Sequence, residues 1–350
     1  MFNIWRIYHN RGNGGISVKT LITVTNHDLR QLLFRPETVK RLEAFSEVGW
    51  LEEGRAYTEQ ELASLVREYD ACITSWGSPK LGYEVLRHAD RLKFIGHAAG
   101  SVVSVVNEDV FDTPITVTNA NPLLAQSTAE AAVAYMLAGA WKLRSYGESL
   151  RAGMWSNNNV ETVPGLSYCT VGLIGYGEIS RHVIRLLKPF RPKLLLYSRY
   201  CSETEAASLG VELCSLDSLL SRSDIISLHN TWTPATEKMI GSEQLRKIRD
   251  GALLVNTARG AIIDEQMLIS ELSTGRFQAV LDVYEREPLP ADNPLLHLPN
   301  VWCLPHIGGF HSRLKPEMGN FVIEDLKRLL SGAQPKGIIT RDVYKRLTPR

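Results

Sequence analysis

The sequence contains no long apolar segment, no excess of either charge and few cysteines. No window of about 18 apolar residues occurs, so we expect no membrane-spanning helix. The formal net charge is +1 and acidic and basic residues are mixed along the chain, which argues against nucleic acid or an anionic membrane as partner. The five cysteines form no C-x-x-C pair and lie near no histidine at metal-ligand spacing, so we expect a reducing, cytoplasmic location and no bound metal.

Residues 1–20 also lack a continuous apolar core of signal-peptide length, so export is not expected. Their centre is rich in glycine and asparagine. This composition predicts a flexible N-terminal extension over residues 1–20, before a first strand at Leu21.

Short apolar runs alternate with helix-like stretches along the rest of the chain. At 350 residues the chain exceeds one usual hydrophobic core, so two domains of roughly 150 residues are expected. One series of runs is LITVT, ACITS, LKFIGH and ITVTN; the second is TVGLIGY, KLLLYS, DIISLHN, ALLVNTA, FQAVLDV and VWCLP. Two mononucleotide-binding halves need six strands, as in the second series. The pattern predicts an α/β fold with two Rossmann-like, doubly wound parallel-sheet domains and a cleft between them.

A helix-favouring stretch, AQSTAEAAVAYMLAGAWKLRSY, separates the two series, and Ser127 with Glu130 predicts a capping box at its start. After the second series, another helical stretch ends at Gly332 and is expected to return to the first series. We therefore expect a discontinuous, flavodoxin-like domain over 21–121 and 306–346. A dinucleotide-binding Rossmann domain is expected over 122–305.

The stretch VGLIGYGEIS contains Gly175-x-Gly177-x-x-Ser180 between a predicted strand and a predicted helix. Two glycines allow a tight turn and a close approach of the backbone to a pyrophosphate at the helix N-terminus, and the third position needs only a small residue. Alone, such a motif is weak evidence; the strands that follow it in order favour a dinucleotide site. The residues expected to contact the cofactor here are Gly175, Tyr176, Gly177, Glu178 and Ile179, although Glu178 brings a carboxylate near the expected phosphates.

The end of the next predicted strand bears on the choice of cofactor. Ser198 occupies the position where an acidic residue would bind the ribose of NAD, and Arg199 follows it. Absence of the acid together with a guanidinium suits a 2′-phosphate, so NADP(H) is preferred over NAD(H). The alternative is that Arg199 stacks on the adenine or lies in solvent while NAD is used.

Polar residues follow three successive predicted strands, at the edge where open α/β sheets bind their ligands. Arg259 ends LLVNTARG, Asp282 and Glu287 lie in LDVYEREP, and His306 ends VWCLPH. Singly, Arg259 could form a surface salt bridge, Glu287 could lie in a solvated loop and His306 could be a turn residue. Together they suit hydride transfer next to a carboxylate, because an arginine can bind the carboxylate, a histidine can move a proton and a carboxylate can orient that histidine.

From about residue 21 to 346 the chain resembles the D-isomer-specific 2-hydroxyacid dehydrogenases. The marks of the resemblance are VGLIGYGEIS, LLVNTARGAIIDEQML, LDVYEREPLP and LPHIGG, in the family's order. The resemblance implies that Arg259 binds the substrate carboxylate and polarises the carbonyl, and that His306, held by Glu287, is the acid/base. It also implies that Asp282 binds the nicotinamide carboxamide. Further cofactor contacts implied by the resemblance are Thr257, Ala258 and Gly308.

The resemblance further implies that the first series forms the substrate domain, with hinges near residues 120 and 305. Its loop FIGHAAGSVVS would offer backbone N–H groups to the substrate carboxylate at Ala99, Gly100 and Ser101. The family commonly has G-x-G, an acidic residue and Asn in this loop, and Val-Ala-Glu where this chain has Thr128-Ala129-Glu130. These departures leave the substrate open among acids such as glyoxylate, hydroxypyruvate and pyruvate. A homodimer through the long helix after Ser127 is also implied.

The leading interpretation is an NAD(P)-dependent oxidoreductase that interconverts a 2-oxo acid and a D-2-hydroxy acid. Arg259, Glu287 and His306 favour it, but a nucleotide-sensing, corepressor-like binding protein of the same fold can carry the same three residues. A relative that acts on formate or phosphite is a third alternative. Turnover of a 2-oxo acid distinguishes the first of these from the others.

Overall fold

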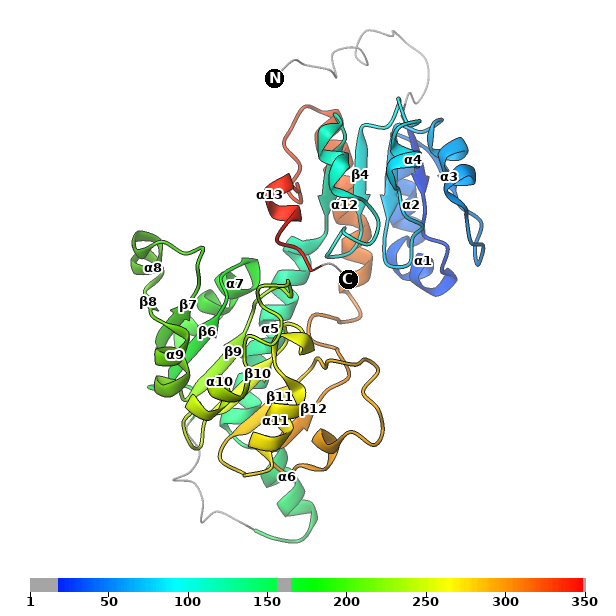
Figure 1. Cartoon of the computed structure of the whole chain (residues 1–350). Helices are drawn as coiled ribbons and strands as arrows, with labels where there is room; N and C mark the ends of the chain where they lie inside the picture. The colour runs from blue at the N-terminus through cyan, green and yellow to red at the C-terminus, as the bar shows by residue number, and fades with distance from the viewer. Residues whose placement is uncertain (1–17, 156–164, 349–350) are drawn as a thin grey trace. The chain divides into compact units, whose positions relative to one another are not determined.

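The computed structural model describes residues 18–155 and 165–348 (Figure 1). They form two compact units: unit 1 contains the described residues up to Leu124 and from His311 onward, and unit 2 contains Ala125–Phe310. The expected N-terminal extension lies outside the described residues as far as residue 17, and the first strand begins at Lys19, two residues before the expected start.

The two units divide at Leu124 and Phe310 rather than at the expected 121 and 305. Leu124, in the first turn of the long helix, still packs against the core of unit 1. Residues after His306 are bound to unit 2, because the backbone N–H groups of Ile307 and Gly308 donate to Asp282. Side-chain contacts of this kind shift a boundary by several residues.

Unit 1 contains a parallel sheet of five strands in the order β2-β1-β3-β4-β5, which is the flavodoxin-like order. The strands are β1 (Lys19–Ile22), β2 (Glu47–Trp50), β3 (Ala71–Thr74), β4 (Phe94–His97) and β5 (Thr116–Asn119). The first series of apolar runs omitted β2. This strand lies at the edge of the sheet, contains a glycine and buries none of its four residues, so it carries little of the apolar signal by which a strand is recognised.

Helices cover both faces of the unit 1 sheet, because successive side chains of each strand point to opposite faces. Ile22, Ile73 and Phe94 pack against α1 (His27–Leu33), α2 (Pro36–Glu43) and α12 (Leu314–Leu330). Their neighbours Leu21 and Cys72 pack with residues of the other face. That face carries α3 (Glu59–Val66), α4 (Tyr83–Leu86), the 3-10 helix η2 (Glu108–Asp112) and α13 (Arg341–Tyr344).

Unit 2 contains a parallel sheet of seven strands in the order β12-β11-β10-β9-β6-β7-β8. They are β6 (Thr170–Ile174), β7 (Lys193–Tyr197), β8 (Glu212–Leu213), β9 (Ile225–Leu228), β10 (Leu253–Asn256), β11 (Gln278–Leu281) and β12 (Val301–Cys303). From β8 to β11 this is the Rossmann order, and β12 extends it. The six strands expected from the sequence are all present, and a seventh, β8, was missed because its two residues left no periodic pattern.

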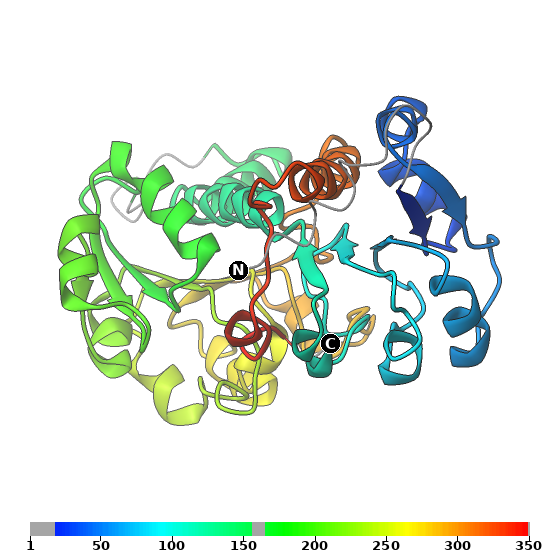
Figure 2. The same ribbon diagram turned by 90° about the horizontal axis from the view of Figure 1, so that it is seen from above.

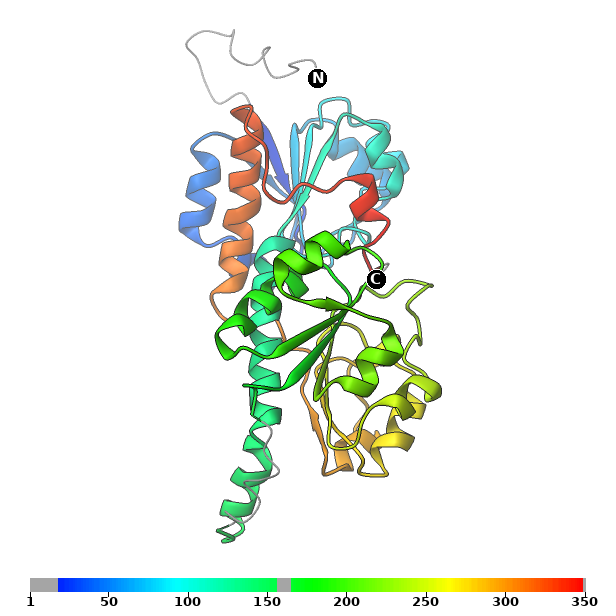
Figure 3. The same ribbon diagram turned by 90° about the vertical axis from the view of Figure 1, so that its left-hand side faces the viewer.

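Two groups of helices enclose this sheet (Figure 2). On one face lie α5 (Asn121–Ala140), α7 (Glu178–Leu187) and α8 (Glu203–Leu209); on the other lie α9 (Leu216–Arg222), α10 (Ser242–Lys247) and α11 (Glu265–Leu272). The predicted capping box at Ser127 is wrong, because α5 begins at Asn121 and the side chains of Ser127 and Thr128 are buried. After α5, helix α6 (Leu143–Arg151) projects away from the sheet (Figure 3).

Candidate active site

Glu287 and His306 meet at the carboxyl edge of the unit 2 sheet. Glu287 follows β11 and His306 follows β12, and His306 Nδ1 lies 2.6 Å from Glu287 Oε2. The other carboxylate oxygen of Glu287 accepts a hydrogen bond from the backbone N–H of Tyr284 at 3.0 Å, which fixes the carboxylate. With Nδ1 paired to a carboxylate, the ring carries its proton there and leaves Nε2 to exchange a proton with a ligand. Both side chains are about one third exposed, at 37% and 34%.

Asp282 anchors the turn that carries His306. Its side chain is 0% exposed, and its Oδ1 and Oδ2 accept the N–H groups of Ile307 at 2.9 Å and Gly308 at 2.7 Å. Burial raises the pKa of Asp282, and the two N–H donors oppose that rise. His306 itself has φ +53°, in the left-handed region that histidine adopts more readily than most residues. Asp282, which was predicted to contact the cofactor, therefore also holds the backbone of the His306 turn.

The Gly308-Gly309 pair is required by close packing. A Cβ on Gly308 would lie 2.6 Å from Asp282 Oδ2. At Gly309, where φ is +113°, a Cβ would lie 2.5 Å from Thr128 Oγ1. Any larger side chain would push the His306 turn away from Asp282 or from α5, so the glycines position the histidine.

Arg259 lies in the loop that follows β10, and Asn256 holds this loop. Asn256 Oδ1 accepts the N–H of Ala258 at 3.0 Å, and Asn256 Nδ2 donates to the Arg259 carbonyl at 3.1 Å. The Arg259 guanidinium donates to the Ala258 carbonyl at 2.6 Å, and in the described part of the chain no carboxylate lies within ion-pair distance of it. Burial lowers the pKa of Arg259, while the charge of Glu287 raises it. Arginine has five N–H donors, so several remain for an anion.

Gly260 brings the Arg259 loop against the loop that carries Glu287. A Cβ at Gly260 would overlap the Tyr284 carbonyl group, so only glycine permits this contact. The contact places the loops after β10 and β11 side by side. Asn256 and Gly260 were not predicted as site residues, although both lie in the stretch LLVNTARG.

The glycine turn after β6 has the geometry expected of a phosphate cradle. Gly175 has φ +99°, and a Cβ there would lie 2.8 Å from the backbone N of Asn230. The buried Ser180 donates from Oγ to the Gly175 carbonyl at 2.7 Å, which explains the small third residue. Gly177 caps α7 with no side-chain hydrogen bond, and nothing described lies within 4 Å of where its Cβ would stand. Internal packing thus explains Gly175 and Ser180 and leaves open space at Gly177.

The neighbours of these glycines are placed differently from one another. The Tyr176 hydroxyl donates to Glu205 on α8 at 2.6 Å, and burial raises the pKa of Tyr176 to about 12. Glu178 is exposed in the first turn of α7, and Ile179 packs against the core of unit 2. Tyr176 can therefore offer a cofactor its backbone but not a free hydroxyl.

Ser198 and Arg199 follow β7, as predicted. Ser198 Oγ accepts the backbone N–H of Tyr200 at 3.0 Å, which forms a local turn. Arg199 is exposed and has no hydrogen bond or ion pair to any residue that the structure describes. Its charge is available to an anionic ligand.

Several buried polar atoms between β6, β9 and β10 have no partner among the described residues. They are both ring nitrogens of His229, Oδ1 of Asn230 and Oγ1 of Thr257. Burial lowers the pKa of His229 to about 4, so its ring is neutral at pH 7. Unpaired buried polar atoms are costly, so these atoms are candidates to pair with a bound ligand. Asn230 Oδ1 lies beside Gly175, and the Thr257 side chain lies beside Gly308. Thr257 was predicted, whereas His229 and Asn230 were missed although they directly follow the apolar run IISL.

In unit 1, the loop after β4 directs its carbonyl groups into the fold. The Ala98 carbonyl accepts from Ser75 Oγ, the Ala99 carbonyl from the Ala120 N–H, and the Gly100 carbonyl from Asn119 Nδ2. The N–H of Ala99 donates to the His97 carbonyl at 2.7 Å. The N–H groups of Gly100 and Ser101 have no acceptor among the described residues. Of the three residues predicted to bind a carboxylate, two therefore present free N–H groups and Ala99 does not.

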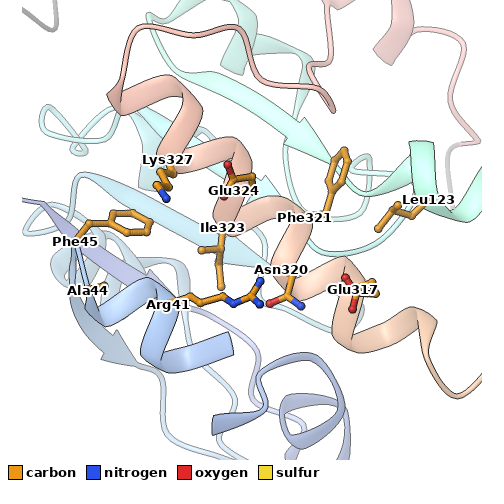
Figure 4. A pocket seen from close by; sticks show the side chains of 10 residues that line it. All are labelled: Arg41, Ala44, Phe45, Leu123, Glu317, Asn320, Phe321, Ile323, Glu324 and Lys327. Atoms are coloured by element: carbon orange, nitrogen blue, oxygen red, sulfur yellow. The ribbon is translucent and has the colours of Figure 1, made fainter. Parts of the chain in front are cut away.

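A groove in unit 1 contains none of the predicted site residues (Figure 4). It has a volume of about 730 Å³ and lies between α2 and α12. Its lining mixes apolar and charged side chains: Arg41, Ala44, Phe45, Leu123, Glu317, Asn320, Phe321, Ile323, Glu324 and Lys327.

Known proteins share this arrangement. A profile of the NAD binding domain of the D-isomer specific 2-hydroxyacid dehydrogenases matches residues 133–308. The chain is 34% identical over 324 residues to a D-3-phosphoglycerate dehydrogenase of Methanocaldococcus jannaschii, covering 92% of this chain and 59% of that protein. It is 32% identical over 318 residues to a glyoxylate reductase of Thermococcus litoralis, covering 89% of this chain and 96% of that protein. The chain belongs to the D-isomer specific 2-hydroxyacid dehydrogenase family.

The chain also matches a solved structure of a glyoxylate reductase from Paecilomyes thermophila, with a TM-score of 0.75 and 25% identity. The match covers 93% of this chain and 99% of that one. The chain spans 59% and 52% of the length of two archaeal D-3-phosphoglycerate dehydrogenases that it matches. The family and the fold class predicted from the sequence are confirmed. In the described residues of this family member, no helix is long and apolar enough to cross a membrane, and no three His, Cys, Asp or Glu side chains gather as a metal site.

Proposed function

We propose that this chain is an NAD(P)-dependent D-2-hydroxyacid dehydrogenase that reversibly reduces a 2-oxo acid. The observation that carries the proposal is the 2.6 Å contact of Glu287 with His306, in the unit that also holds Arg259 and the glycine turn. A bound nicotinamide supplies hydride to the carbonyl carbon, or accepts it in the reverse direction. The protein must then hold the carboxylate, move one proton and orient both partners.

His306 and Arg259 carry out the chemistry on the substrate side. In reduction, protonated His306 donates from Nε2 to the carbonyl oxygen, and the Glu287 carboxylate stabilises the imidazolium. In oxidation, the neutral ring accepts the hydroxyl proton, so the two directions respond oppositely to pH. Arg259 binds the substrate carboxylate through its remaining N–H donors and polarises the adjacent carbonyl.

The residues around the glycine turn fit a dinucleotide. The open space at Gly177 and the N-terminus of α7 suit a pyrophosphate, and the unpaired atoms of His229, Asn230 and Thr257 suit the polar groups of the cofactor. Ala258 and Gly308 lie in the adjoining loops. Asp282 has used one lone pair of each oxygen on the His306 turn, and its remaining lone pairs can accept from the nicotinamide carboxamide.

The choice between the two cofactors rests on Ser198 and Arg199. Neither residue brings a negative charge to the ribose position, and the Arg199 guanidinium is exposed and unpaired among the described residues. These features favour NADP(H) over NAD(H), because a 2′-phosphate gains a cation there and meets no carboxylate.

We further propose that the N–H groups of Gly100 and Ser101, which have no acceptor among the described residues, bind the carboxylate of the substrate as a small anion-binding nest. Both relatives named above are described as acting on small acids: glyoxylate for one and 3-phosphoglycerate for the other. A small 2-oxo acid is therefore the proposed substrate class.

We also propose a homodimer that buries α6 and the end of α5. No residue of α6 is buried, and this includes its large apolar side chains: Leu143 and Leu150 are 59% and 58% exposed. Trp141, just before the helix, is 54% exposed. Met154 and Trp155 add further exposed apolar area directly after the helix. An apolar surface of this kind is typical of a protein interface.

Initial rates of NADPH and NADH oxidation test the proposed reaction. The substrates are glyoxylate, hydroxypyruvate, pyruvate, 3-phosphohydroxypyruvate and phenylpyruvate, each with both cofactors. We expect turnover of at least one acid, with formation of the D-hydroxy acid. Tight cofactor binding without turnover of any 2-oxo acid would contradict the proposal and favour a nucleotide-sensing protein.

A further inference from the structure

The last described residues of the chain lie against the loop proposed to bind the substrate carboxylate. Residues 337–339 run beside β5, where the Asn119 N–H donates to the Gly337 carbonyl and the Ile339 N–H donates to the Val117 carbonyl. The chain then forms α13 and continues to Thr348, which is 4% exposed. The Thr348 carbonyl accepts a hydrogen bond from Ser101 Oγ at 2.9 Å.

Helix α13 has its own attachment to the segment that follows the loop. The Tyr344 hydroxyl donates to the Val106 carbonyl at 3.0 Å, and its ring contacts that of Phe111 edge to face, with centroids 5.4 Å apart. Arg341 pairs with Asp112 at 2.6 Å. The C-terminal segment would therefore stay bound to unit 1 if its single contact with Ser101 were lost.

Ser101 is the position at which this segment acts on the loop. The three preceding carbonyl groups of the loop are already held by Ser75, Ala120 and Asn119. The bond from Ser101 Oγ to Thr348 fixes the Ser101 side chain in one rotamer. It also restrains the Ser101 backbone, whose N–H belongs to the proposed nest. Because its hydroxyl donates to Thr348, Ser101 offers a ligand its backbone N–H rather than its side chain.

We propose that the C-terminal segment 341–348 is a positioning element for substrate binding. Through the Ser101–Thr348 hydrogen bond it holds the N–H groups of Gly100 and Ser101 in the orientation that binds the carboxylate of a 2-oxo acid. This inference rests on the proposed function of the loop. Small acids depend on it most, because they offer the protein little besides their carboxylate and carbonyl group.

A double-mutant cycle between Ser101→Ala and deletion of residues 348–350 tests the proposal. Each change removes one partner of the same bond, worth about three- to tenfold in KM for a small 2-oxo acid. We expect each to raise KM by that factor, to leave kcat within twofold and to leave the dissociation constant of the nicotinamide cofactor unchanged. The combined variant should show no further rise, because the two changes remove one interaction.

Three matched variants serve as controls. Ser101→Thr keeps the hydroxyl and should restore most of the affinity, and deletion of residues 349–350 alone keeps an acceptor at Thr348. Ser104→Ala removes an exposed hydroxyl from the same loop and should leave KM unchanged. Thermal unfolding of each variant shows whether unit 1 remains folded.

Amide hydrogen exchange of the peptide spanning residues 98–106 gives a second readout that needs no substrate. We expect faster exchange in Ser101→Ala and in the 348–350 deletion. Unchanged KM with unchanged exchange, or additive effects on KM, would overturn the proposal. If the wild-type chain turns over no 2-oxo acid, the proposed function fails, and with it the role of the segment in substrate binding. The exchange measurement then tests the hold on the loop by itself: faster exchange in the two variants supports it, and unchanged exchange refutes it.

Discussion

Asp282→Asn tests whether the buried carboxylate holds the His306 turn or acts mainly on the cofactor. In the structure each carboxylate oxygen accepts one backbone N–H, at 2.9 and 2.7 Å. Asparagine keeps one acceptor oxygen, while its NH2 group would face the other backbone N–H, donor to donor. One charge-assisted bond is lost outright, and such bonds contribute about 1.5–3 kcal/mol.

The magnitude follows from these two contacts and from burial. Asparagine is spared the cost of a buried charge, which is the cause of the raised pKa of Asp282, so the loss stays below that of two full bonds. We expect unfolding of unit 2 to become easier by about 2–3 kcal/mol, which lowers Tm by about 4–12 °C in a unit of this size. The His306 turn should also loosen and lower kcat.

Calorimetric melting of the full chain without cofactor measures this effect. Asp292→Asn is the matched control, because Asp292 is exposed and makes no hydrogen bond to any described residue; its Tm should stay within 1 °C or so of wild type, as surface changes usually do. An Asp282→Asn variant that melts like wild type but loses turnover would refute the anchoring role. It would instead place the function of Asp282 on the nicotinamide.

Four further predictions concern single residues. His306→Gln should lower kcat by about a hundredfold or more without changing cofactor affinity, measured by initial rates and fluorescence titration; unchanged turnover would remove His306 from the chemistry. Gly177→Ala should weaken cofactor binding severalfold and leave Tm unchanged, because its Cβ meets only open space within the chain. Arg199→Ala should weaken NADPH binding far more than NADH binding in the same titration, and equal losses would contradict the preference for NADP(H). Burial lowers the pKa of His97 from 6.5 to about 3, so between these pH values only the unfolded chain takes up this proton, and the free energy of unfolding falls as pH falls. Replacing His97 with Asn should reduce the slope of this free energy against pH by up to about 1.4 kcal/mol per pH unit. An unchanged slope would contradict the shift.

The parts of the fold with strong apolar periodicity could be predicted from the sequence. The strands that became β3, β6 and β9 are continuous apolar runs, and their order led to the fold class. Strands β2 and β8 lie at sheet edges and bury little, so they left no such run. The error at Ser127 has another cause: Ser127 is buried inside α5 while Glu130 is exposed on the same helix, so the capping-box spacing arose within a longer helix rather than at its start.

The candidate site could be predicted only as a set of polar residues at one sheet edge. From that placement Glu287 and His306 were predicted to lie close together, and their side chains are 2.6 Å apart in the structure. The remaining contacts join side chains to backbone and cannot be predicted from sequence spacing. They are the hydrogen bonds from the turn after His306 to Asp282 and the hydrogen bonds of Asn256 with the Arg259 loop. His229 and Asn230 stood at the same edge and could have been included on that ground.

The contact of Gly260 with the Tyr284 carbonyl has a consequence for how new specificities can arise on this scaffold. It couples the loop of Arg259, the proposed anion-binding residue, to the loop of Glu287, whose carboxylate contacts His306, wholly within unit 2. The nest of N–H groups at Gly100 and Ser101 belongs to unit 1. If the proposed function holds, changes in the loop after β4 can alter which acid is accepted while Glu287 and His306 keep their alignment, so substrate range and chemistry can be selected separately.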